Sequence, residues 1–354
     1  MSVDITPFQS EPPKILVIDV TAGVTFNTGT NDLATAWAAA KAGTPGNTVP
    51  DSGNPGILRL PEGVFDLGDT PLELDHDYLH LEGAGANATI IKGAVSSSSL
   101  IDRSKICNIG NLQIQEEEGD CINDSAAGAA NSRSYNLILK SGNAGTGACL
   151  RNPRSFYRNI EMLRGDVAID GLVSTARLFG CFISGPTVSL AAMAGGLFRD
   201  CTIIGGASGI CAVTPSGVVT FHGCELTASD KDLFDTADYL RFIGCNVDGV
   251  ASKAILGAIA GDNIEIIGGR FAAGSGGSIF EIPNATTRRV SISGQPRLVG
   301  TLKGGAGTFS PAGGGFTILP DGTAATYDGV LVYDETADTH KGQQNNVAKT
   351  FTVS

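Results

Sequence analysis

The chain has 354 residues and a net charge of −12, and 42 % of its residues are apolar. The negative charge argues against nucleic-acid binding, which needs a basic surface, and the apolar content is too high for a disordered chain. No apolar run approaches the ~20 residues needed to span a bilayer, and the N-terminus lacks the segments of a signal peptide. With its 48 glycines, the composition favours many short strands joined by glycine-rich bends.

The N-terminal part of the chain contains a polar segment followed by a helix. Residues 1–15 include Pro7, Pro12 and Pro13 and are predicted to form an arm. Asn31 is a favourable helix-capping residue, and the segment Asp-Leu-Ala-Thr-Ala-Trp-Ala-Ala-Ala-Lys after it consists mainly of helix formers. We therefore predict one helix that ends near Lys41, with Trp37 packed against the elements that follow it.

Two apolar, strand-like segments come next. They read Gly56-Ile-Leu-Arg-Leu-Pro-Glu-Gly-Val-Phe-Asp-Leu and Tyr78-Leu-His-Leu-Glu-Gly-Ala-Gly, and the second continues to Thr-Ile-Ile-Lys-Gly93. A short helix, a Leu-Pro-x-Gly-x-Phe strand and this glycine-rich coil, in that order, resemble the first coils of the pectate-lyase-like β-helix superfamily. The resemblance covers roughly residues 16–300. It implies a right-handed parallel β-helix but no particular reaction, because that superfamily includes polysaccharide lyases, hydrolases and epimerases as well as bacteriophage tailspikes and fibres.

A phrase with the pattern apolar-x-x-Cys-x-apolar recurs through the centre of the chain. Nine related phrases begin between residues 109 and 292, about 23 residues apart on average. A fixed period of this length indicates a solenoid, and alternating apolar residues indicate strands with one face inward. A leucine-rich repeat is the alternative, but its Asn position and its intervening helices are missing. We predict an all-β, single-stranded right-handed parallel β-helix of about ten coils, capped by the N-terminal helix.

The cysteines follow the same repeat. Seven of the eight fall in two columns, one in the recurring phrase and one about half a coil later: Cys181, Cys201, Cys224 and Cys245, and then Cys121, Cys149 and Cys211. The sequence has no Cys-x-x-Cys pair and its four histidines are scattered, which argues against a metal site. The lack of a recognisable export signal argues against a disulfide scaffold. We expect stacked, buried thiols that act as small apolar residues, and neither a metal nor a cofactor.

The repeat ends near residue 302. Glycine-rich segments then precede strand-like segments at Phe316–Leu319, Gly329–Tyr333 and Thr350–Val353. The predicted organisation is therefore an arm (1–15), a β-helix with its N-terminal cap (16–301) and a β-rich C-terminal module (302–354). The resemblance to phage spikes implies that such a module holds a homotrimer together.

The candidate catalytic acids lie between two coils. Asp230, Asp232, Asp235 and Asp238 supply carboxylates that could act as acid and base on a glycosidic bond if they were suitably separated. We prefer the alternative interpretation, in which they form a solvated turn.

Other acidic residues allow similar alternatives. The segment Glu116-Glu117-Glu118 is a candidate calcium or sugar site, but we expect an exposed acidic bend. Asp120 and Asp124 flank Cys121, and Asp166 and Asp170 follow about one coil later, a spacing compatible with a ladder of acids from coil to coil.

The motifs of the superfamily's enzymes are incomplete in this chain. The Arg-x-Pro-x-x-Arg pattern of pectate lyases is nearly matched at Arg151-Asn-Pro-Arg-Ser-Phe156, where Phe156 replaces the last arginine. The Asn-Thr-Asp, Asp-Asp, Gly-His-Gly and Arg-Ile-Lys elements of polygalacturonases are absent. Aromatic residues make up only 6 % of the chain, and most phenylalanines lie in the inward-facing phrases, which disfavours a sugar-cleaving groove.

These observations favour a structural surface protein of a bacteriophage: a homotrimeric spike, fibre or capsid-decorating protein. We expect it to be made in the host cytoplasm and assembled on the virion surface. Its expected partners are copies of itself and either other virion proteins or a host surface glycan, without nucleic-acid binding or membrane insertion. The alternative is a polysaccharide lyase or glycoside hydrolase of the same fold, as in a tailspike depolymerase. A bacterial adhesin fits less well without an export signal.

Overall fold

The computed structural model describes most of the chain between residues 49 and 206 and shorter segments elsewhere. The described residues are 16–19, 32–43, 49–96, 98–142, 147–164, 167–185, 188–191, 194–206, 210, 217–228, 233–234, 240–249, 254–256, 264–275, 278–281, 290–294, 296–299, 301–303, 331–334, 339–344 and 347–351. The predicted arm, residues 1–15, lies outside them. The division into arm, β-helix and C-terminal module therefore stays a prediction.

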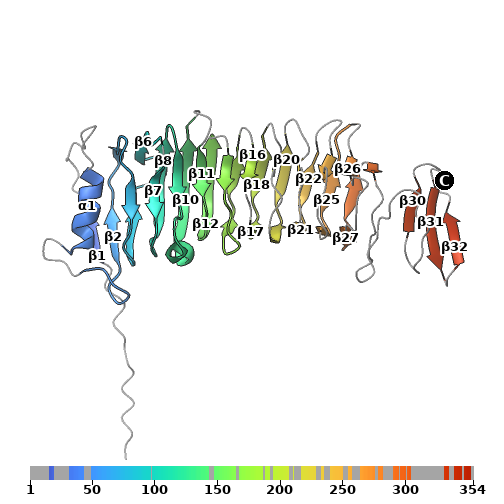
Figure 1. The fold of residues 1–354 in the computed structure, drawn as a ribbon, viewed down its shortest axis with the longest axis horizontal. Helices are drawn as coiled ribbons and strands as arrows, with labels where there is room; N and C mark the ends of the chain where they lie inside the picture. The colour runs from blue at the N-terminus through green and yellow to red at the C-terminus, as the bar shows by residue number, and fades with distance from the viewer. Residues whose placement is uncertain are drawn as a thin grey trace, which may run out of the picture.

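The described residues form one α-helix, one 3-10 helix and many short strands, which follow one another along a rod (Figure 1). The helices are α1 (Asp32–Lys41) and η1 (Ala127–Asn131). The strands are β1 (Leu16–Asp19), β2 (Gly56–Arg59), β3 (Gly63–Asp66), β4 (Leu72–Leu74), β5 (Leu79–Glu82), β6 (Thr89–Gly93), β7 (Ser99–Arg103), β8 (Ile109–Glu116), β9 (Asp120–Asn123), β10 (Arg133–Ser141), β11 (Ala148–Arg151), β12 (Phe156–Arg164), β13 (Val167–Asp170), β14 (Arg177–Phe179), β15 (Phe182–Ser184), β16 (Val188–Ala191), β17 (Gly196–Arg199), β18 (Thr202–Gly205), β19 (Val219–His222), β20 (Glu225–Ala228), β21 (Leu240–Ile243), β22 (Asn246–Asp248), β23 (Ala254–Leu256), β24 (Ile264–Ile267), β25 (Arg270–Ala272), β26 (Ser278–Glu281), β27 (Val290–Ser293), β28 (Arg297–Val299), β29 (Thr301–Lys303), β30 (Leu331–Asp334), β31 (Thr339–Gln344) and β32 (Val347–Phe351).

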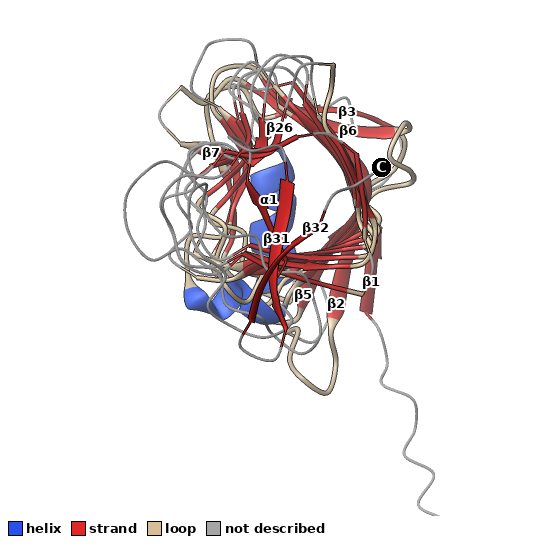
Figure 2. Cartoon of the chain, turned by 90° about the vertical axis from the view of Figure 1, so that its right-hand side faces the viewer, coloured by secondary structure: helices blue, strands red, loops and turns tan. Residues whose placement is uncertain are grey.

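Parallel pairing between successive coils builds the rod. A first ladder joins β1, β2, β5, β8, β10, β12, β14, β17, β19, β21, β24 and β27. A second ladder joins β3, β6, β8, β10, β12, β15, β18, β20, β22, β25 and β28. A third ladder joins β4, β7, β9, β11, β13 and β16, and a further parallel sheet joins β23, β26 and β29. Viewed along the rod, the strands of successive coils superimpose around a common axis (Figure 2).

The predicted parallel β-helix is therefore confirmed, and its number of coils differs slightly from the predicted ten. The difference has a simple cause, because the coils are not equally long. In the first ladder, the interval from the start of β5 at Leu79 to the start of β8 at Ile109 is longer than the interval from β14 at Arg177 to β17 at Gly196. A mean period therefore predicts the number of coils only approximately.

Helix α1 caps the N-terminal end of the rod, as predicted. It packs against β2 and β4 and buries Leu33, Trp37 and Ala40. The Trp37 indole Nε1 donates a hydrogen bond to Asp75 Oδ1 over 3.3 Å, and Lys41 pairs with the same carboxylate. These contacts cover the apolar side chains that the first coil would otherwise expose to water.

Replacing Asp75 with asparagine should loosen this cap at neutral pH and have no effect in strong acid. Burial alone would raise the pKa of Asp75, but hydrogen bonds from Lys41 and Trp37 outweigh it and hold the pKa below its ordinary value of 3.8. The carboxylate therefore stabilises the folded state above that value, and the contribution is lost as the pH falls through the folded-state pKa. Trp37 is the one tryptophan of the chain, so its fluorescence reports thermal melting of the cap. Equal melting of D75N and the parent protein at pH 7 would contradict the prediction.

The bend between the first and second ladders is made by one column of left-handed residues. Its members have φ between 52° and 69° and occupy equivalent places in successive coils: Asn111, Asn136, Asn159, Gly180, Asp200, Gly223, Gly244, Gly268 and Gly294. Gly, Asn and Asp adopt this conformation at the lowest cost. Asn136 Nδ2 donates to Asn111 Oδ1 over 2.9 Å, and Asn159 Nδ2 donates to Asn136 Oδ1 over 3.2 Å. The column therefore sets the bend in each coil and, at its asparagines, links coil to coil.

Cysteine and phenylalanine side chains stack inside the rod. Cys181, Cys201, Cys224 and Cys245 directly follow the left-handed column, and they are buried thiols, as are Cys107, Cys121 and Cys149. Cys224 Sγ donates to the carbonyl oxygen of Phe198 in the preceding coil over 3.5 Å. Buried Phe198, Phe221 and Phe242 stack with ring centroids 5.1 and 5.4 Å apart. Cys211 lies outside the described residues.

Three of these thiols, Cys107, Cys201 and Cys224, should resist alkylation in the native protein. Burial raises the pKa of the Cys107 thiol to about 12, and a hydrogen bond to the preceding thiol of the stack, together with burial, raises the pKa of Cys201 and of Cys224 to about 12. Because the thiolate is the reactive form, iodoacetamide at pH 8 should label these three cysteines only after unfolding. Peptide mapping by mass spectrometry would check this, and rapid labelling of native Cys224 would contradict it.

The C-terminal strands pair differently from those of the rod. Strands β30, β31 and β32 form an antiparallel sheet. Strand formation was predicted for parts of β30 and β32, whereas β31 was not predicted and Phe316–Leu319 lies outside the described residues. Among the described residues, no helix has the length and apolar character needed to cross a bilayer.

Candidate ligand-binding surface

The predicted acidic cluster cannot be located as a site. Asp230, Asp232, Asp235 and Asp238 lie outside the described residues, so their role stays a prediction. Within the part of the chain that the structure describes, no three His, Cys, Asp or Glu side chains are arranged to hold a metal ion.

Glu116, expected in an exposed acidic bend, is instead buried. Its Oε1 accepts backbone N–H hydrogen bonds from Val95 over 2.7 Å, Glu118 over 3.0 Å and Gly119 over 3.1 Å. The carboxylate therefore ties the turn after β8 to the preceding coil. The expectation of exposure is correct for Glu117 and Glu118 and wrong for Glu116.

Asp124 faces the interior, where it meets a buried arginine. The Arg103 guanidinium lies 2.8 Å from Asp124 Oδ1, and both side chains are fully buried. Arg103 also donates to the hydroxyls of Ser134, Ser155 and Tyr157 over 3.0 to 3.1 Å. Tyr157 in turn donates to Asp124 Oδ2 over 2.5 Å, and Ser155 donates to the same oxygen over 3.0 Å. This network joins β7, β10 and β12 beneath their outer surface.

The charges of this network depend on one another. Burial disfavours the Arg103 cation, but the Asp124 carboxylate outweighs that effect and raises the pKa of Arg103. Burial and the same carboxylate raise the pKa of Tyr157 well above its ordinary value, so its hydroxyl stays protonated. The network consequently holds a fixed set of donors and acceptors around neutral pH, as a structural element does.

A second ion-pair cluster replaces the proposed ladder of acids. Arg151 on β11 pairs with Asp120 on β9 and, over 2.6 Å, with Asp170 on β13. Asn152 Nδ2 donates to Asn123 Oδ1 over 3.1 Å beside it. Asp120 and Asp170 are thus bridged by a cation from the strand between them. Asp166 lies outside the described residues.

The near match to the pectate-lyase pattern is divided between two ladders. Arg151 belongs to the third ladder, where two carboxylates engage it, whereas Phe156 begins β12 of the first ladder. Arg154 Nε donates to the carbonyl oxygen of Asp124 over 3.2 Å. The two ends of the pattern therefore belong to different surfaces of the coil.

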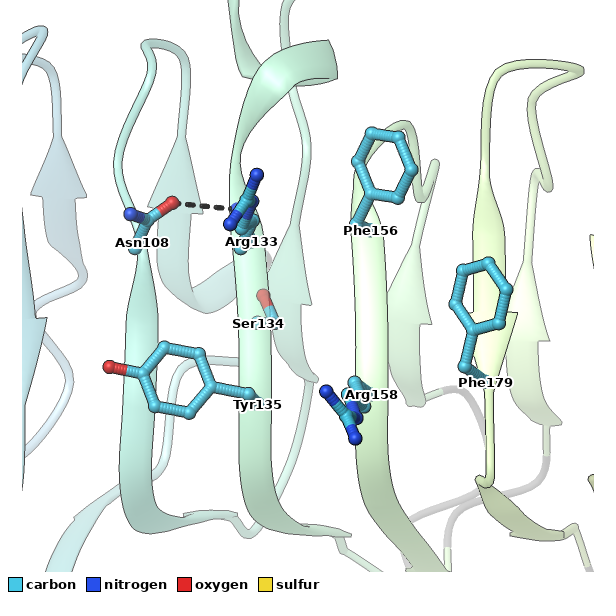
Figure 3. Close-up of a pocket in the computed structure, with 7 residues that line it drawn as sticks. All are labelled: Asn108, Arg133, Ser134, Tyr135, Phe156, Arg158 and Phe179. Carbon is cyan, nitrogen blue, oxygen red and sulfur yellow. Dashed lines mark hydrogen bonds between the residues drawn. The ribbon is translucent and has the colours of Figure 1, made fainter.

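A shallow depression of about 440 Å³ lies on the outer side of the first ladder (Figure 3). It crosses β10, β12 and β14 and begins at the residue before β8. We call it the arginine–aromatic groove; its lining residues are Asn108, Arg133, Ser134, Tyr135, Phe156, Arg158 and Phe179. Phe156 is 45 % exposed, so the expectation that phenylalanines mainly fill the core does not hold at this position.

The outward positions of β10, β12 and β14 form two rows in which arginines and aromatic rings alternate. The first row contains Arg133, Phe156 and Arg177, which pair in register, and the second contains Tyr135, Arg158 and Phe179, which pair likewise. Each strand therefore contributes one arginine and one ring. The row that contains the arginine alternates from each strand to the next. Figure 3 shows this exchange for Arg133 with Tyr135 and for Phe156 with Arg158.

The two arginines that line the groove are available for a ligand. Arg133 and Arg158 are exposed, and neither forms an ion pair with a described residue. Arg177, which lies just outside the lining, donates to the carbonyl oxygens of Ser174 and Ala176 over 2.8 and 2.9 Å. The groove thus presents two uncompensated positive charges on a chain whose net charge is −12.

Neighbouring residues hold the groove in shape. Asn108 Oδ1 accepts from the Arg133 backbone N–H over 2.8 Å, while the Asn108 N–H donates to His80 Nδ1 over 3.0 Å. Burial lowers the pKa of His80, which keeps this nitrogen an acceptor at neutral pH. The Tyr135 ring lies against Gly110, where a Cβ would come within 2.3 Å of Tyr135 Cζ. Burial and the nearby Glu82 raise the pKa of Tyr135, so its hydroxyl remains protonated.

The groove was missed in the sequence, although its signal is present there. Arg133 and Tyr135 flank the inward Ser134, and Phe156 and Arg158 flank the inward Tyr157. Aligning the phrases and comparing only their outward places would have brought the arginines and rings into adjacent columns. A count of all phenylalanines obscured this pattern because Phe198, Phe221, Phe242 and Phe271 are buried.

The fold and the groove define a parallel β-helix protein with an outward polar and aromatic surface. No protein-family model matches the chain, and no curated protein matches it. Among solved structures it is similar to ORF18 of Geobacillus virus E2, at 13 % identity and a TM-score of 0.41, over 96 % of this chain and 86 % of that one.

Two other solved structures show a comparable likeness. The A-module of mannuronan C-5 epimerase AlgE4 from Azotobacter vinelandii is 12 % identical with a TM-score of 0.47, over 82 % of this chain and 96 % of that one. Tailspike protein 3 of bacteriophage CBA120 is 14 % identical with a TM-score of 0.33, over 92 % of this chain and 67 % of that one. At these identities the likeness concerns the fold alone.

Proposed function

We propose that this chain is a surface protein of a bacteriophage particle that attaches to a host glycan through the arginine–aromatic groove without cleaving it. The observation that carries the proposal is the combination of Arg133, Arg158, Tyr135, Phe156 and Phe179 in one open groove. Aromatic faces offer sugar rings an apolar stacking surface, and guanidinium groups bind hydroxyls and anionic substituents with several donors at once.

The chemistry of the groove favours binding over hydrolysis. Its lining residues supply amide, hydroxyl, guanidinium and aromatic groups, and none of them carries a carboxylate. Glycosidic hydrolysis normally needs a pair of carboxyl groups, one acting as acid and the other as base or nucleophile. Of the acids considered in the sequence analysis, the described Asp120, Asp124 and Asp170 belong to ion pairs elsewhere on the coil.

The proposal also includes two broader points, that the chain lies on the surface of the phage particle and that it forms a homotrimer. They are supported by the resemblance of residues 16–300 to a superfamily that includes phage tailspikes and fibres, and by a C-terminal antiparallel sheet distinct in pairing from the rod. A rod built of stacked coils can extend a binding surface outward from a particle. The mass of the purified chain in solution, measured by light scattering, tests the trimer.

Binding of the purified chain to envelope polysaccharide from candidate hosts tests the function. The parent protein should bind and leave the glycan length unchanged, as measured by size-exclusion chromatography. The R133A/R158A variant should lose most of this affinity, because two charge-assisted contacts are removed. The matched control is R297A, which removes another exposed arginine on the distant strand β28.

Two outcomes would contradict the proposal. Equal affinity of the parent and R133A/R158A proteins would remove the groove as the binding site. Shortening of the glycan by the parent protein would instead support the polysaccharide lyase or hydrolase alternative. Alanine variants of Asp230, Asp232, Asp235 and Asp238 would then test the predicted acids.

A further inference from the structure

We infer that the groove takes a polyanionic, ribbon-like glycan with two-fold screw symmetry, lying along the rod with its acidic groups directed to alternate sides. The inference rests on the proposed glycan binding and specifies the class of ligand. It follows from the order of the arginines and rings along the rod and not from their presence alone.

The outward side chains of the groove are spaced by two distances, one between strands and one along a strand. Neighbouring strands of a ladder lie about 4.8 Å apart, and the two outward residues of one strand lie about 6.6 Å apart along it. Arg133 and Tyr135 occupy the two sides of the groove on β10, and Phe156 and Arg158 occupy them in the opposite order on β12. On β14 the first order returns, with Arg177 and Phe179.

One step along the rod therefore combines a translation of about 4.8 Å with an exchange of the two sides. A two-fold screw axis along the rod has this effect on a ligand. In an extended glycan of this symmetry each sugar is turned by half a revolution from its neighbour, with a rise per sugar comparable to one coil. An acidic group carried by every sugar then points to alternate edges of the ribbon.

The charges fit such a ligand. Arg133 and Arg158 lie on neighbouring strands, at opposite sides of the groove. Both are exposed, and neither forms an ion pair with a described residue. Two carboxylates on successive sugars of the ribbon would meet these two guanidinium groups. On each strand the position across the groove from the arginine holds an aromatic residue, Tyr135 or Phe156, and carries no charge. A neutral ribbon would leave both guanidinium groups without an anionic partner.

The ligand test compares glucuronate oligosaccharides of equal length and equal charge. Cello-oligosaccharides oxidised at C6 form an extended two-fold ribbon, whereas amylose oligosaccharides oxidised at C6 contain the same charged sugar in a curved helix. Unoxidised cello-oligosaccharides keep the ribbon without charge. Titration calorimetry of the full chain should show at least tenfold tighter binding of the oxidised cello-oligosaccharide than of either other ligand. Equal binding of the two oxidised ligands would overturn the inference, and so would binding of neither.

The protein test exchanges positions without changing composition. The F156R/R158F variant keeps the charge and the aromatic content but places both lining arginines in one row, and both exchanged side chains are exposed, which limits the effect on folding. Its affinity for the oxidised cello-oligosaccharide should fall roughly tenfold, as for R133A or R158A alone, the loss of one charge-assisted contact.

The outcomes separate the two proposals. Full affinity of F156R/R158F, combined with weakened R133A and R158A, would overturn the alternating arrangement and leave glycan binding in the groove intact. Full affinity of all three variants would overturn both.

Discussion

Replacing Arg103 with methionine should lower the free energy of unfolding by about 3–5 kcal/mol, the cost of leaving a buried charge without its partner. Asp124 would keep its hydrogen bonds from Ser155 and Tyr157 but lose the guanidinium 2.8 Å away, in a site where neither side chain reaches water. Ser134 would lose a donor at the same time. Urea denaturation of the parent and R103M proteins at pH 7 measures the difference.

A double variant and an exposed pair provide the controls for this result. R103M/D124N removes both charges, so its destabilisation should be smaller than the sum of the two single effects. R241A breaks the half-exposed pair with Glu265 on the surface and should cost about 1 kcal/mol or less. If R103M were no less stable than R241A, the network would not hold the coils together as described.

Replacing Phe221 with alanine should also cost about 3–5 kcal/mol, by opening a cavity in the centre of the rod. Phe221 is fully buried, with Phe198 and Phe242 stacked on its two sides and Phe234 tilted against it at 5.6 Å. The rings on both sides are held by their own coils and cannot close the gap. F221L fills most of the space and should cost clearly less, and the exposed F156A should change the thermal melting temperature little. A mild effect of F221A would show that neighbouring coils can collapse into the space.

The inward-facing part of this fold could be predicted from the sequence, and the bends only in part. Apolar residues and cysteines return at regular intervals because each coil buries the same face, which predicts the β-helix. The bend column was harder to recognise since it combines Asn111, Gly180 and Asp200, residues that share only their tolerance of positive φ. The coil count was slightly different because the turns vary in length.

The buried network and the groove depend on relations between coils that one phrase does not contain. Arg103 ends an ordinary strand pattern, and nothing in Ser99-Leu-Ile-Asp-Arg103 separates an arginine facing Asp124 from one facing water. The groove needs Arg133, Phe156 and Arg158 to be aligned in register across two strands, and a phrase-by-phrase inspection considers them apart. The predicted acids Asp230 to Asp238 lie outside the described residues and remain predictions.

The alternation of Arg133, Phe156 and Arg177 along one row has a consequence for how such a rod can change its length. Duplicating a single coil inside the groove would place two like side chains next to each other and reverse the order of everything beyond them. Duplicating a pair of coils would preserve the order and lengthen the surface. The smallest evolutionary insertion that keeps this surface in phase is therefore two coils, although the smallest that preserves the fold is one.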